Sequence, residues 1–155
     1  MSIRTHIQYM KKCVELGKEA LLKGNPPVGA ILVKDDSIIG LGQEAGKSSG
    51  DITKHAEIES IRDALKIHQS LKGSTLYTTH EPCIMCSYVI RHHQIKKIVF
   101  GVSSEFVGGI TSEFKILETE NVPKWNNAPI IVEGILENEC LALSEKYQTI
   151  QNFNK

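Results

Sequence analysis

The sequence predicts an α/β protein in which strands and helices form layers. The first observation is an alternation of strand, helix, strand, helix and strand patterns through the middle of the chain. This alternation is typical of a layered domain whose later strands are parallel. The second observation is size and composition, because 155 residues with 41% hydrophobic and 23% charged residues suit a globular protein with an ordinary core. We therefore expect a single domain over residues 1–155.

The chain begins with an expected helix and an expected hairpin. Apolar residues recur at helical spacing across residues 4–23, with lysines and glutamates on the opposite side. Pro26 and Pro27 then interrupt the chain. Residues 28–33 and 37–42 have the composition of two strands joined by a tight turn, which predicts a hairpin.

A loop and four regular elements are expected in the middle of the chain. Residues 43–54 are polar and rich in glycine, which predicts the loop. Asp51 and Thr53 are natural helix caps and are expected to begin the next helix. The patterns that follow predict a helix at about 55–68, a strand at about 74–79, a helix at about 83–93 and a strand within 95–102.

The last third of the chain has weaker patterns. Residues 110–117 could form a short helix, and residues 121–127 are expected to be a loop. Residues 129–132 predict a fifth strand, and a closing helix is expected from residue 135 to about residue 151. The whole segment 103–127 could also supply walls of a substrate site.

Charge and hydropathy make some classes of partner less favoured, although a local basic patch for nucleic acid remains possible. Eighteen basic and eighteen acidic residues give zero net charge, so no overall field draws the chain to nucleic acid or to a membrane. No apolar run approaches the roughly 18 residues of a membrane span, and the N-terminus does not resemble a signal peptide. A cytoplasmic location without a membrane partner is expected. The four cysteines would be reduced there, and Cys13 and Cys140 are interpreted as core residues.

The residues that carry chemistry stand at two predicted helix starts. Cys83 and Cys86 follow Pro82 at one start, and His55 and Glu57 stand at the start of the preceding helix. Helix N-termini favour thiolates. One imidazole and two thiolates leave a fourth tetrahedral position for water, as a catalytic zinc requires. Zinc lowers the pKa of bound water from about 15.7 to about 7, so hydroxide forms, and Glu57 is placed to carry its proton to a ring nitrogen and then to the leaving group.

Other interpretations of the two cysteines are open. Cys-x-x-Cys alone also fits a redox dithiol, or half of a structural zinc site with His80, His92 or His93 as a further ligand. The combination of His-x-Glu with Pro-Cys-x-x-Cys is typical of zinc deaminases of cytosine or adenine. The sequence therefore predicts one zinc ion per chain and hydrolytic deamination that releases ammonia.

At these residues the sequence resembles the cytidine/deoxycytidylate deaminase superfamily. It is similar above all to the branch of tRNA adenosine deaminases, guanine deaminases and fungal-type cytosine deaminases. The matching segments include Pro27-Val28-Gly29-Ala30, His55-Ala56-Glu57, Glu81 to Cys86, Val99-Phe100-Gly101 and Val132 to Leu136. The resemblance implies a three-layer α/β/α, cytidine-deaminase-like fold with a five-stranded mixed sheet between helices. It also implies zinc held by His55, Cys83 and Cys86, with Glu57 as the proton shuttle, in a homodimer.

The resemblance also suggests which residues border the substrate. Glu44 lies near the position where many relatives have an asparagine that binds the base or ribose. A carboxylate there could accept two hydrogen bonds from the N1 and amino groups of guanine, although a solvated loop acid is the alternative. Backbone groups of Ala56 would border the reacting base. Val28, Pro82 and His80 complete the expected substrate site.

A free nucleobase or nucleoside is the predicted substrate, with a purine such as guanine favoured. Zero net charge argues against a partner whose phosphates must be neutralised, so nucleic acid is not favoured. The alternative is a tRNA wobble adenosine deaminase, which converts adenosine to inosine. A non-catalytic zinc-binding module is a third hypothesis. Glu57 argues against it, because a proton shuttle contributes nothing to holding the metal.

Two features near the end of the chain have alternative interpretations. The local cluster of basic residues is expected to be the solvated end of a helix. It consists of Arg91, His92, His93, Lys96 and Lys97. Phe114 and Trp125 are expected to be structural, although either could stack on a base.

Overall fold

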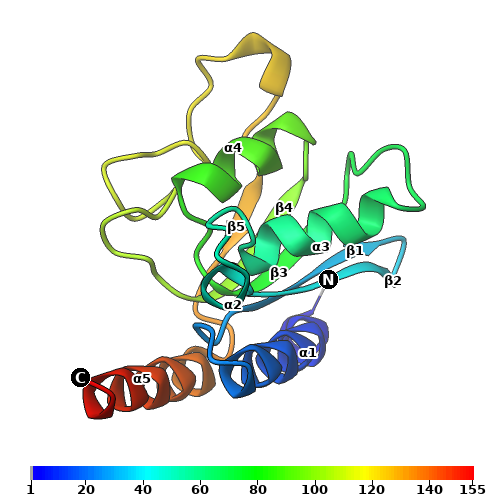
Figure 1. Ribbon diagram of the computed structural model, residues 1–155. Helices are drawn as coiled ribbons and strands as arrows, with labels where there is room; N and C mark the ends of the chain where they lie inside the picture. Colours follow the sequence, from blue (N-terminus) through cyan, green and yellow to red (C-terminus); the bar gives the residue numbers. More distant parts are fainter. Residues whose placement is uncertain (1) are drawn as a thin grey trace.

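The chain folds into a five-stranded sheet with helices on both of its faces (Figure 1). The structure is a computed structural model that describes residues 2–155. Its elements are, in chain order, α1 (Ile3–Leu22), β1 (Gly29–Lys34), β2 (Ser37–Gln43), α2 (Gly46–Ser49), α3 (Ala56–Leu65), β3 (Thr75–His80), α4 (Ile84–His92), β4 (Lys97–Val102), η1 (Pro123–Trp125), β5 (Ile130–Val132) and α5 (Glu137–Phe153). No helix in the described part of the chain is long and apolar enough to cross a membrane.

The sheet is mixed, as the sequence predicts. Its strand order is β2-β1-β3-β4-β5. Strand β1 is antiparallel to both β2 and β3, whereas β3, β4 and β5 are parallel to one another. The carboxyl ends of β3 and β4 therefore meet at one edge of the sheet, and the segments that follow these two strands begin there.

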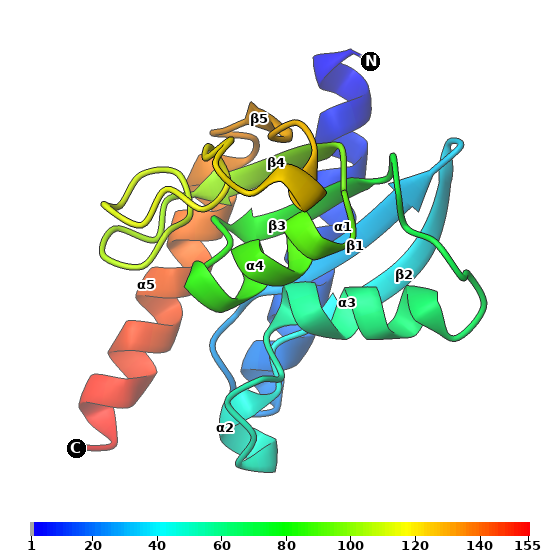
Figure 2. The same ribbon diagram turned by 90° about the horizontal axis from the view of Figure 1, so that it is seen from above.

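Two hydrophobic cores lie on the two faces of the sheet. Helices α1 and α5 cover one face, and α3 and α4 cover the other (Figure 2). Ile31, Tyr77 and Val99 belong to the core with residues of α1 and α5, whereas Leu32 and Leu76 belong to the core with residues of α3 and α4. This alternation follows from the two-residue period of a strand. The predicted three-layer α/β/α arrangement is confirmed. The expectation for the two spare cysteines is also confirmed, since both are fully buried in the first core: Cys13 and Cys140.

Strand β2 allows α3 to approach the sheet very closely. A Cβ atom at Gly42 would lie 2.1 Å from the carbonyl oxygen of Ala56, and one at Gly40 would lie 2.2 Å from that of Ser60. Only glycine leaves room for the helix backbone at these two positions. The close contact holds the N-terminal end of α3 over the sheet, at the edge where β3 ends.

The predicted short helix over residues 110–117 is wrong. The structure has turns there and no helix. The N–H groups that would form helical bonds have other acceptors: that of Phe114 donates to the Ser112 hydroxyl at 3.0 Å, and that of Leu117 donates to the carbonyl oxygen of Gly109 at 3.1 Å. The bonds between residues four apart that define an α-helix are therefore not formed.

Arg91 is buried, so the expectation of a fully solvated basic cluster is wrong for this residue. It lies in α4 with only 2% of its surface exposed, and its guanidinium stacks 5.2 Å from the centre of the Trp125 ring. Trp125 is itself buried, which confirms the structural interpretation. The guanidinium donates to three carbonyl oxygens, those of Ile116 at 2.9 Å, Thr119 at 2.8 Å and Asn126 at 3.3 Å.

Replacing Arg91 with methionine is expected to destabilise the protein by at least about 3 kcal/mol. The substitution removes three hydrogen bonds to partly buried carbonyl oxygens and the contact with the Trp125 ring, and each hydrogen bond from a charged group contributes about 1.5–3 kcal/mol. Urea unfolding measures the change. The matched control is Arg62→Met, because Arg62 forms an exposed ion pair with Glu59 at 2.6 Å and such pairs contribute about 0–1 kcal/mol. Equal losses in the two variants would contradict the assignment.

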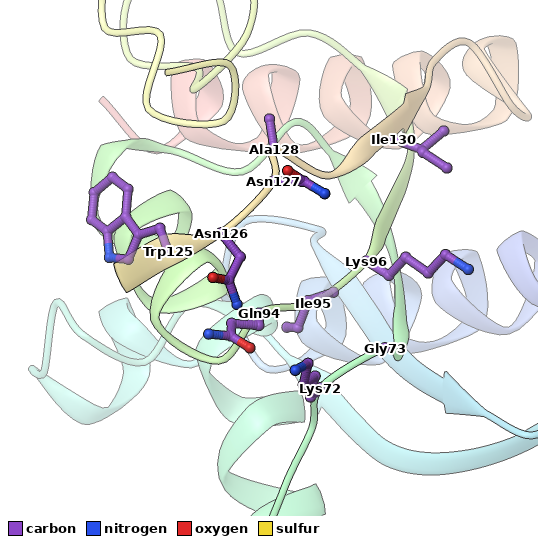
Figure 3. Close-up of a pocket in the computed structure, with 10 residues that line it drawn as sticks. All are labelled: Lys72, Gly73, Gln94, Ile95, Lys96, Trp125, Asn126, Asn127, Ala128 and Ile130. Atoms are coloured by element: carbon purple, nitrogen blue, oxygen red, sulfur yellow. The ribbon is translucent and has the colours of Figure 1, made fainter. Parts of the chain in front are cut away.

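A wide hollow of the described chain lies away from the carboxyl ends of β3 and β4. It has a volume of about 580 Å³ and opens beside Lys72, Lys96 and the segment 125–130 (Figure 3). Its lining contains lysine and carboxamide side chains but no cysteine, histidine or carboxylate. Size alone therefore does not locate the chemistry of this protein.

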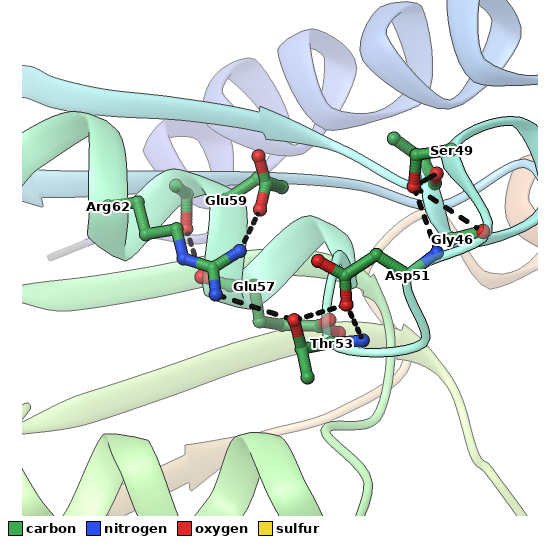
Figure 4. A network of polar contacts seen from close by, with 9 residues as sticks. Gly46, Ser49, Asp51, Thr53, Glu57, Glu59 and Arg62 are labelled. Carbon is green, nitrogen blue, oxygen red and sulfur yellow. Dashed lines mark hydrogen bonds and ion pairs between the residues drawn. The ribbon is translucent and has the colours of Figure 1, made fainter.

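The expected loop 43–54 contains the short helix α2 and a tight polar turn. Asp51 accepts hydrogen bonds from the N–H of Thr53 at 2.9 Å and from its hydroxyl at 2.7 Å, and Arg62 reaches the same hydroxyl at 3.4 Å (Figure 4). The prediction that Asp51 and Thr53 cap the following helix is wrong. His55 is the N-terminal cap of α3, and its side chain makes no capping bond. The turn is followed by His55, which thus begins α3 at the edge of the sheet where β3 ends.

Candidate active site

Three metal-binding side chains meet where α3 and α4 begin. His55 immediately precedes α3 and Cys83 immediately precedes α4. The Nδ1 atom of His55 lies 3.4 Å from Sγ of Cys83 and 3.5 Å from Sγ of Cys86. The junctions at which the two helices start therefore bring together residues that are 28 and 31 positions apart.

This cluster fits zinc. The three donor atoms lie within 4.8 Å of one another. Zinc with tetrahedral bonds of about 2.1 Å to nitrogen and 2.3 Å to sulfur places these atoms about 3.6 Å apart, close to the distances observed. No other cluster of this kind occurs among residues 2–155. The structural-zinc alternative therefore lacks a fourth protein ligand in the described chain, and an open position remains for water.

The electrostatics of the cluster also suit a cation. A hydrogen bond from Cys86 and the neighbouring His55 lower the pKa of Cys83 to about 4, despite burial. The hydrogen bond to Cys83 raises the pKa of His55 to about 9. Without a metal, the cluster thus balances a thiolate with a protonated imidazole. A zinc ion displaces such protons when it binds.

Glu57 lies beside the zinc ligands without being needed to hold the metal. It is on the first turn of α3 and only 4% exposed. Its Oε1 accepts a hydrogen bond from the Thr78 hydroxyl at 2.8 Å, and its Oε2 lies 3.5 Å from Sγ of Cys86. Burial raises the pKa of Glu57 to about 7. A carboxyl group with this pKa can both accept and return a proton near neutral pH.

A pocket of about 250 Å³ opens onto the cluster. Of the residues expected to bind substrate, Val28, Glu44 and His80 line it. Ala56 and Pro82 are buried and do not line it. The full lining is Pro26, Val28, Glu44, His55, Glu57, His80, Glu81, Cys83, Ser104 and Val107.

Glu44 is a buried carboxylate rather than a solvated loop acid, since only 9% of its surface is exposed. Burial raises the pKa of Glu44. The nearby His55 and hydrogen bonds from the backbone of Gly46 and Ala56 oppose this shift only in part. The pocket therefore presents the carboxyl group of Glu44 in addition to Glu57 and Glu81.

His80 joins the pocket to the closing helix. Its Nε2 lies 2.8 Å from the Ser144 hydroxyl in α5, and its Nδ1 lies 2.9 Å from the Thr79 hydroxyl. Burial lowers the pKa of His80 to about 4, so the ring is neutral near pH 7. It shapes the pocket without adding charge, and both of its nitrogen atoms already have partners.

Segment 103–127 supplies one wall of the pocket, through Ser104 and Val107 alone. Phe114 and Trp125 do not line the pocket. The order of the elements could have predicted that Ser104 and Val107 line the pocket. Both residues follow β4, which ends at the same edge of the sheet as β3. Ligands of parallel sheets bind outside the carboxyl ends of the strands.

A three-layer fold with this donor set, a buried carboxylate beside it and an adjoining pocket defines a zinc-dependent hydrolytic deaminase, an enzyme that acts on a C–N bond. A family model, the cytidine and deoxycytidylate deaminase zinc-binding region, matches residues 3–102, and the chain belongs to this family.

Individual relatives resemble the chain over most of its length. The tRNA-specific adenosine deaminase of Haemophilus influenzae is 40% identical over 143 residues, which cover 90% of this chain and 79% of that protein. The tRNA-specific adenosine deaminase of Aquifex aeolicus is 35% identical and covers 93% of this chain and 95% of its own. A structure from a study of A-to-I editing by tRNA:A34 deaminases at the wobble position has a TM-score of 0.80 at 28% identity, covering 88% of this chain and 98% of that chain.

These relatives overturn one prediction. A free nucleobase or nucleoside, with guanine favoured, was expected as the substrate, whereas the proteins that match 90% and 93% of this chain are tRNA-specific adenosine deaminases. The expectation that nucleic acid is not favoured is wrong for the same reason. Zero net charge was a poor guide, because it sums over the whole surface while phosphate contacts are local.

Proposed function

We propose that this protein removes the exocyclic amino group of an adenosine in a transfer RNA, giving inosine and ammonia. The observation that supports this most strongly is the similarity to tRNA-specific adenosine deaminases across 90% and 93% of the chain. The complete set of zinc ligands and the buried Glu57 are consistent with activity. The homodimer expected from the family resemblance is part of the same proposal.

The residues of the pocket account for the proton transfers of this reaction. His55, Cys83 and Cys86 would hold a zinc ion, which when bound would supply a Lewis acid for the attacking water. Glu57 accepts one proton of that water and delivers it to the ring nitrogen N1, while the water oxygen bonds to C6. The second proton goes to the amino group, which leaves as ammonia. Thr78 holds the Glu57 carboxyl in place through its hydrogen bond of 2.8 Å.

The contacts proposed for the target nucleotide follow the pocket lining. Val28, just before β1, and His80, at the end of β3, lie on two neighbouring segments of the pocket lining and would together border the flat base. The carboxyl group of Glu44 is the proposed partner of polar groups on the base or ribose. Backbone groups of Ala56 and Pro82 would support the ring from behind the ligands.

The rim of the pocket favours a substrate larger than a free base. Phe106 is 83% exposed and is the chain neighbour of Val107 in the pocket wall. Proteins recognise single-stranded loops of RNA by stacking unpaired bases on exposed aromatic side chains. Phe106 is therefore proposed to stack on a base that flanks the target adenosine.

Replacing Phe106 with alanine is expected to raise KM for an anticodon stem-loop by about 5- to 100-fold, with little change in kcat. Stacking of one base on an aromatic ring contributes about 1–3 kcal/mol. Steady-state rates of inosine formation measure the effect. Ile67→Ala is the control, because Ile67 is 84% exposed beyond the far end of α3. A KM within about twofold of the wild type in both variants would exclude the stacking role.

A substrate comparison tests the proposed function itself. The purified zinc enzyme is incubated with an anticodon stem-loop that carries a wobble adenosine, and separately with free adenosine, adenine, guanine and cytosine. We expect inosine from the stem-loop at a kcat/KM far above that of any free base or nucleoside. Deamination of the small molecules alone would refute the proposal.

A further inference from the structure

Glu81 is a buried acid that the proton transfers do not use. It stands two residues before the zinc ligand Cys83, and only 2% of its surface is exposed. Each carboxylate oxygen accepts two hydrogen bonds. Oε1 accepts from the N–H of Ser104 at 2.9 Å and from the hydroxyl of Thr111 at 2.5 Å. Oε2 accepts from the N–H groups of Ile110 and Thr111, both at 2.8 Å.

These donors come from the two ends of one loop, residues 103–111, which we call the wall loop. The wall loop begins after β4 and passes Ser104 and Val107, which line the catalytic pocket. Its only strand-like contact is an isolated bridge between Gly108 and Cys83. Within the loop, the N–H of Gly108 donates to the carbonyl oxygen of Ser104 at 2.7 Å. The N–H groups at its two ends depend on the Glu81 carboxylate, since irregular backbone must find partners for its N–H groups.

The wall loop packs directly on Glu81 and on the segment that carries the zinc ligands. A Cβ atom at Gly108 would lie 2.2 Å from Oε2 of Glu81, so a glycine is needed there. The N–H of Gly109 donates to the carbonyl oxygen of Pro82 at 2.9 Å. The Ser104 hydroxyl donates to the carbonyl oxygen of Glu81 at 2.8 Å. One side of the loop thus touches the metal segment while the other side faces substrate.

We propose that Glu81 is a positioning residue that holds the wall loop against the zinc-ligand segment and so sets the width of the catalytic pocket before substrate binds. Both carboxylate oxygens are needed, because four donors converge on them. Preorganised pocket walls matter for rate, since a misplacement of about 1 Å can cost about 100-fold. The consequence for turnover rests on the proposed function, whereas the effect on the loop does not.

The test is Glu81→Gln in the zinc-loaded protein. Glutamine has the same size, but an NH2 group replaces one of the two carboxylate oxygens. An NH2 group cannot accept the two hydrogen bonds that this oxygen accepts, so those two bonds are lost. The amide protons of Ser104, Ile110 and Thr111 are expected to exchange with solvent at least about 10-fold faster, because their buried partner is weakened. For the stem-loop substrate, kcat/KM is expected to fall by about 10- to 100-fold. Zinc content should stay at one ion per chain.

Two further variants complete the experiment. Thr111→Val removes only the hydroxyl donor and is expected to give a smaller change in both readouts, which keeps the test valid if Glu81→Gln does not fold. Glu59→Gln is the matched control, because Glu59 lies on the outer side of α3 and pairs with Arg62. It should change neither amide exchange in the wall loop nor kcat/KM.

Amide exchange tests the positioning role of Glu81 separately from the proposed deaminase function. Unchanged exchange of the wall loop in both Glu81→Gln and Thr111→Val would overturn the positioning role, whatever the activity. Loss of zinc with unchanged exchange would also overturn it, since Glu81 would then act on the metal site. If the wild type fails to deaminate the stem-loop, the proposed function is wrong, and the exchange measurement still decides the role of Glu81.

Discussion

Replacing Glu57 with glutamine is expected to slow deamination by about 100- to 10,000-fold while the zinc stays bound. Loss of a positioned general acid–base group has an effect of this size. Glutamine keeps the shape of the side chain and can still accept the hydrogen bond from Thr78, which is 2.8 Å away in the wild type. It cannot take a proton from water or return one to the leaving group. Single-turnover rates of inosine formation and elemental analysis for zinc measure the two quantities.

Glu59→Gln provides the comparison on the same helix. Glu59 is two residues further along α3, outside the pocket lining, and is expected to leave the rate within about twofold of the wild type. Wild-type turnover by Glu57→Gln would show that another group carries the proton. Loss of zinc from Glu57→Gln would show that Glu57 helps to hold the metal. We do not expect this loss, because Glu57 lies 3.5 Å from the ligand Cys86 and is not itself one of the three ligands.

The zinc site is predictable from the sequence because its geometry is largely local. Cys83 and Cys86 are one helical turn apart, and a proline and a strand pattern mark the junction before them. His55 and Glu57 have the same relation to the start of α3. Alternating strands and helices then place both helix starts at one sheet edge, so the order of elements is sufficient to bring the ligands together.

The wall of the pocket is not predictable in the same way. Residues 103–127 contain only the single-turn helix η1 and are shaped mainly by two buried side chains from other parts of the chain, Glu81 and Arg91. Hydrogen bonds from one side chain to an irregular backbone leave no period in the sequence. An apolar pattern over residues 110–117 therefore suggests a helix, although the N–H groups of Phe114 and Leu117 donate to Ser112 and Gly109 and not to helical partners.

The substrate is the least predictable property, and composition misled the prediction. A net charge of zero states nothing about where basic residues lie. Glu44 suggested guanine, but a buried carboxylate in the pocket can serve a ribose hydroxyl as well as a base. The reaction class depends on atoms that the zinc motif supplies, whereas substrate choice depends on irregular loops around it.

Replacing Cys83 with alanine is expected to remove most of the zinc and, with it, activity. Two of the three donor atoms remain, and the thiolate that gives the site its negative charge is lost. Bound zinc stabilises the folded state because the unfolded chain has no preformed site. If zinc contributes about 2 kcal/mol, Tm falls by about 4–8 °C for a chain of this size. Elemental analysis and thermal unfolding with and without a chelator measure both effects.

Cys13→Ala separates metal loss from simple destabilisation. Cys13 is fully buried in the core on the opposite face of the sheet, so its truncation leaves a small cavity and lowers stability by about 1 kcal/mol without touching the ligands. This variant should keep one zinc ion per chain and should lose stability when a chelator is added, as the wild type does. Cys83→Ala should be insensitive to the chelator, because little metal remains to be removed. Full zinc occupancy in Cys83→Ala would exclude Cys83 as a ligand.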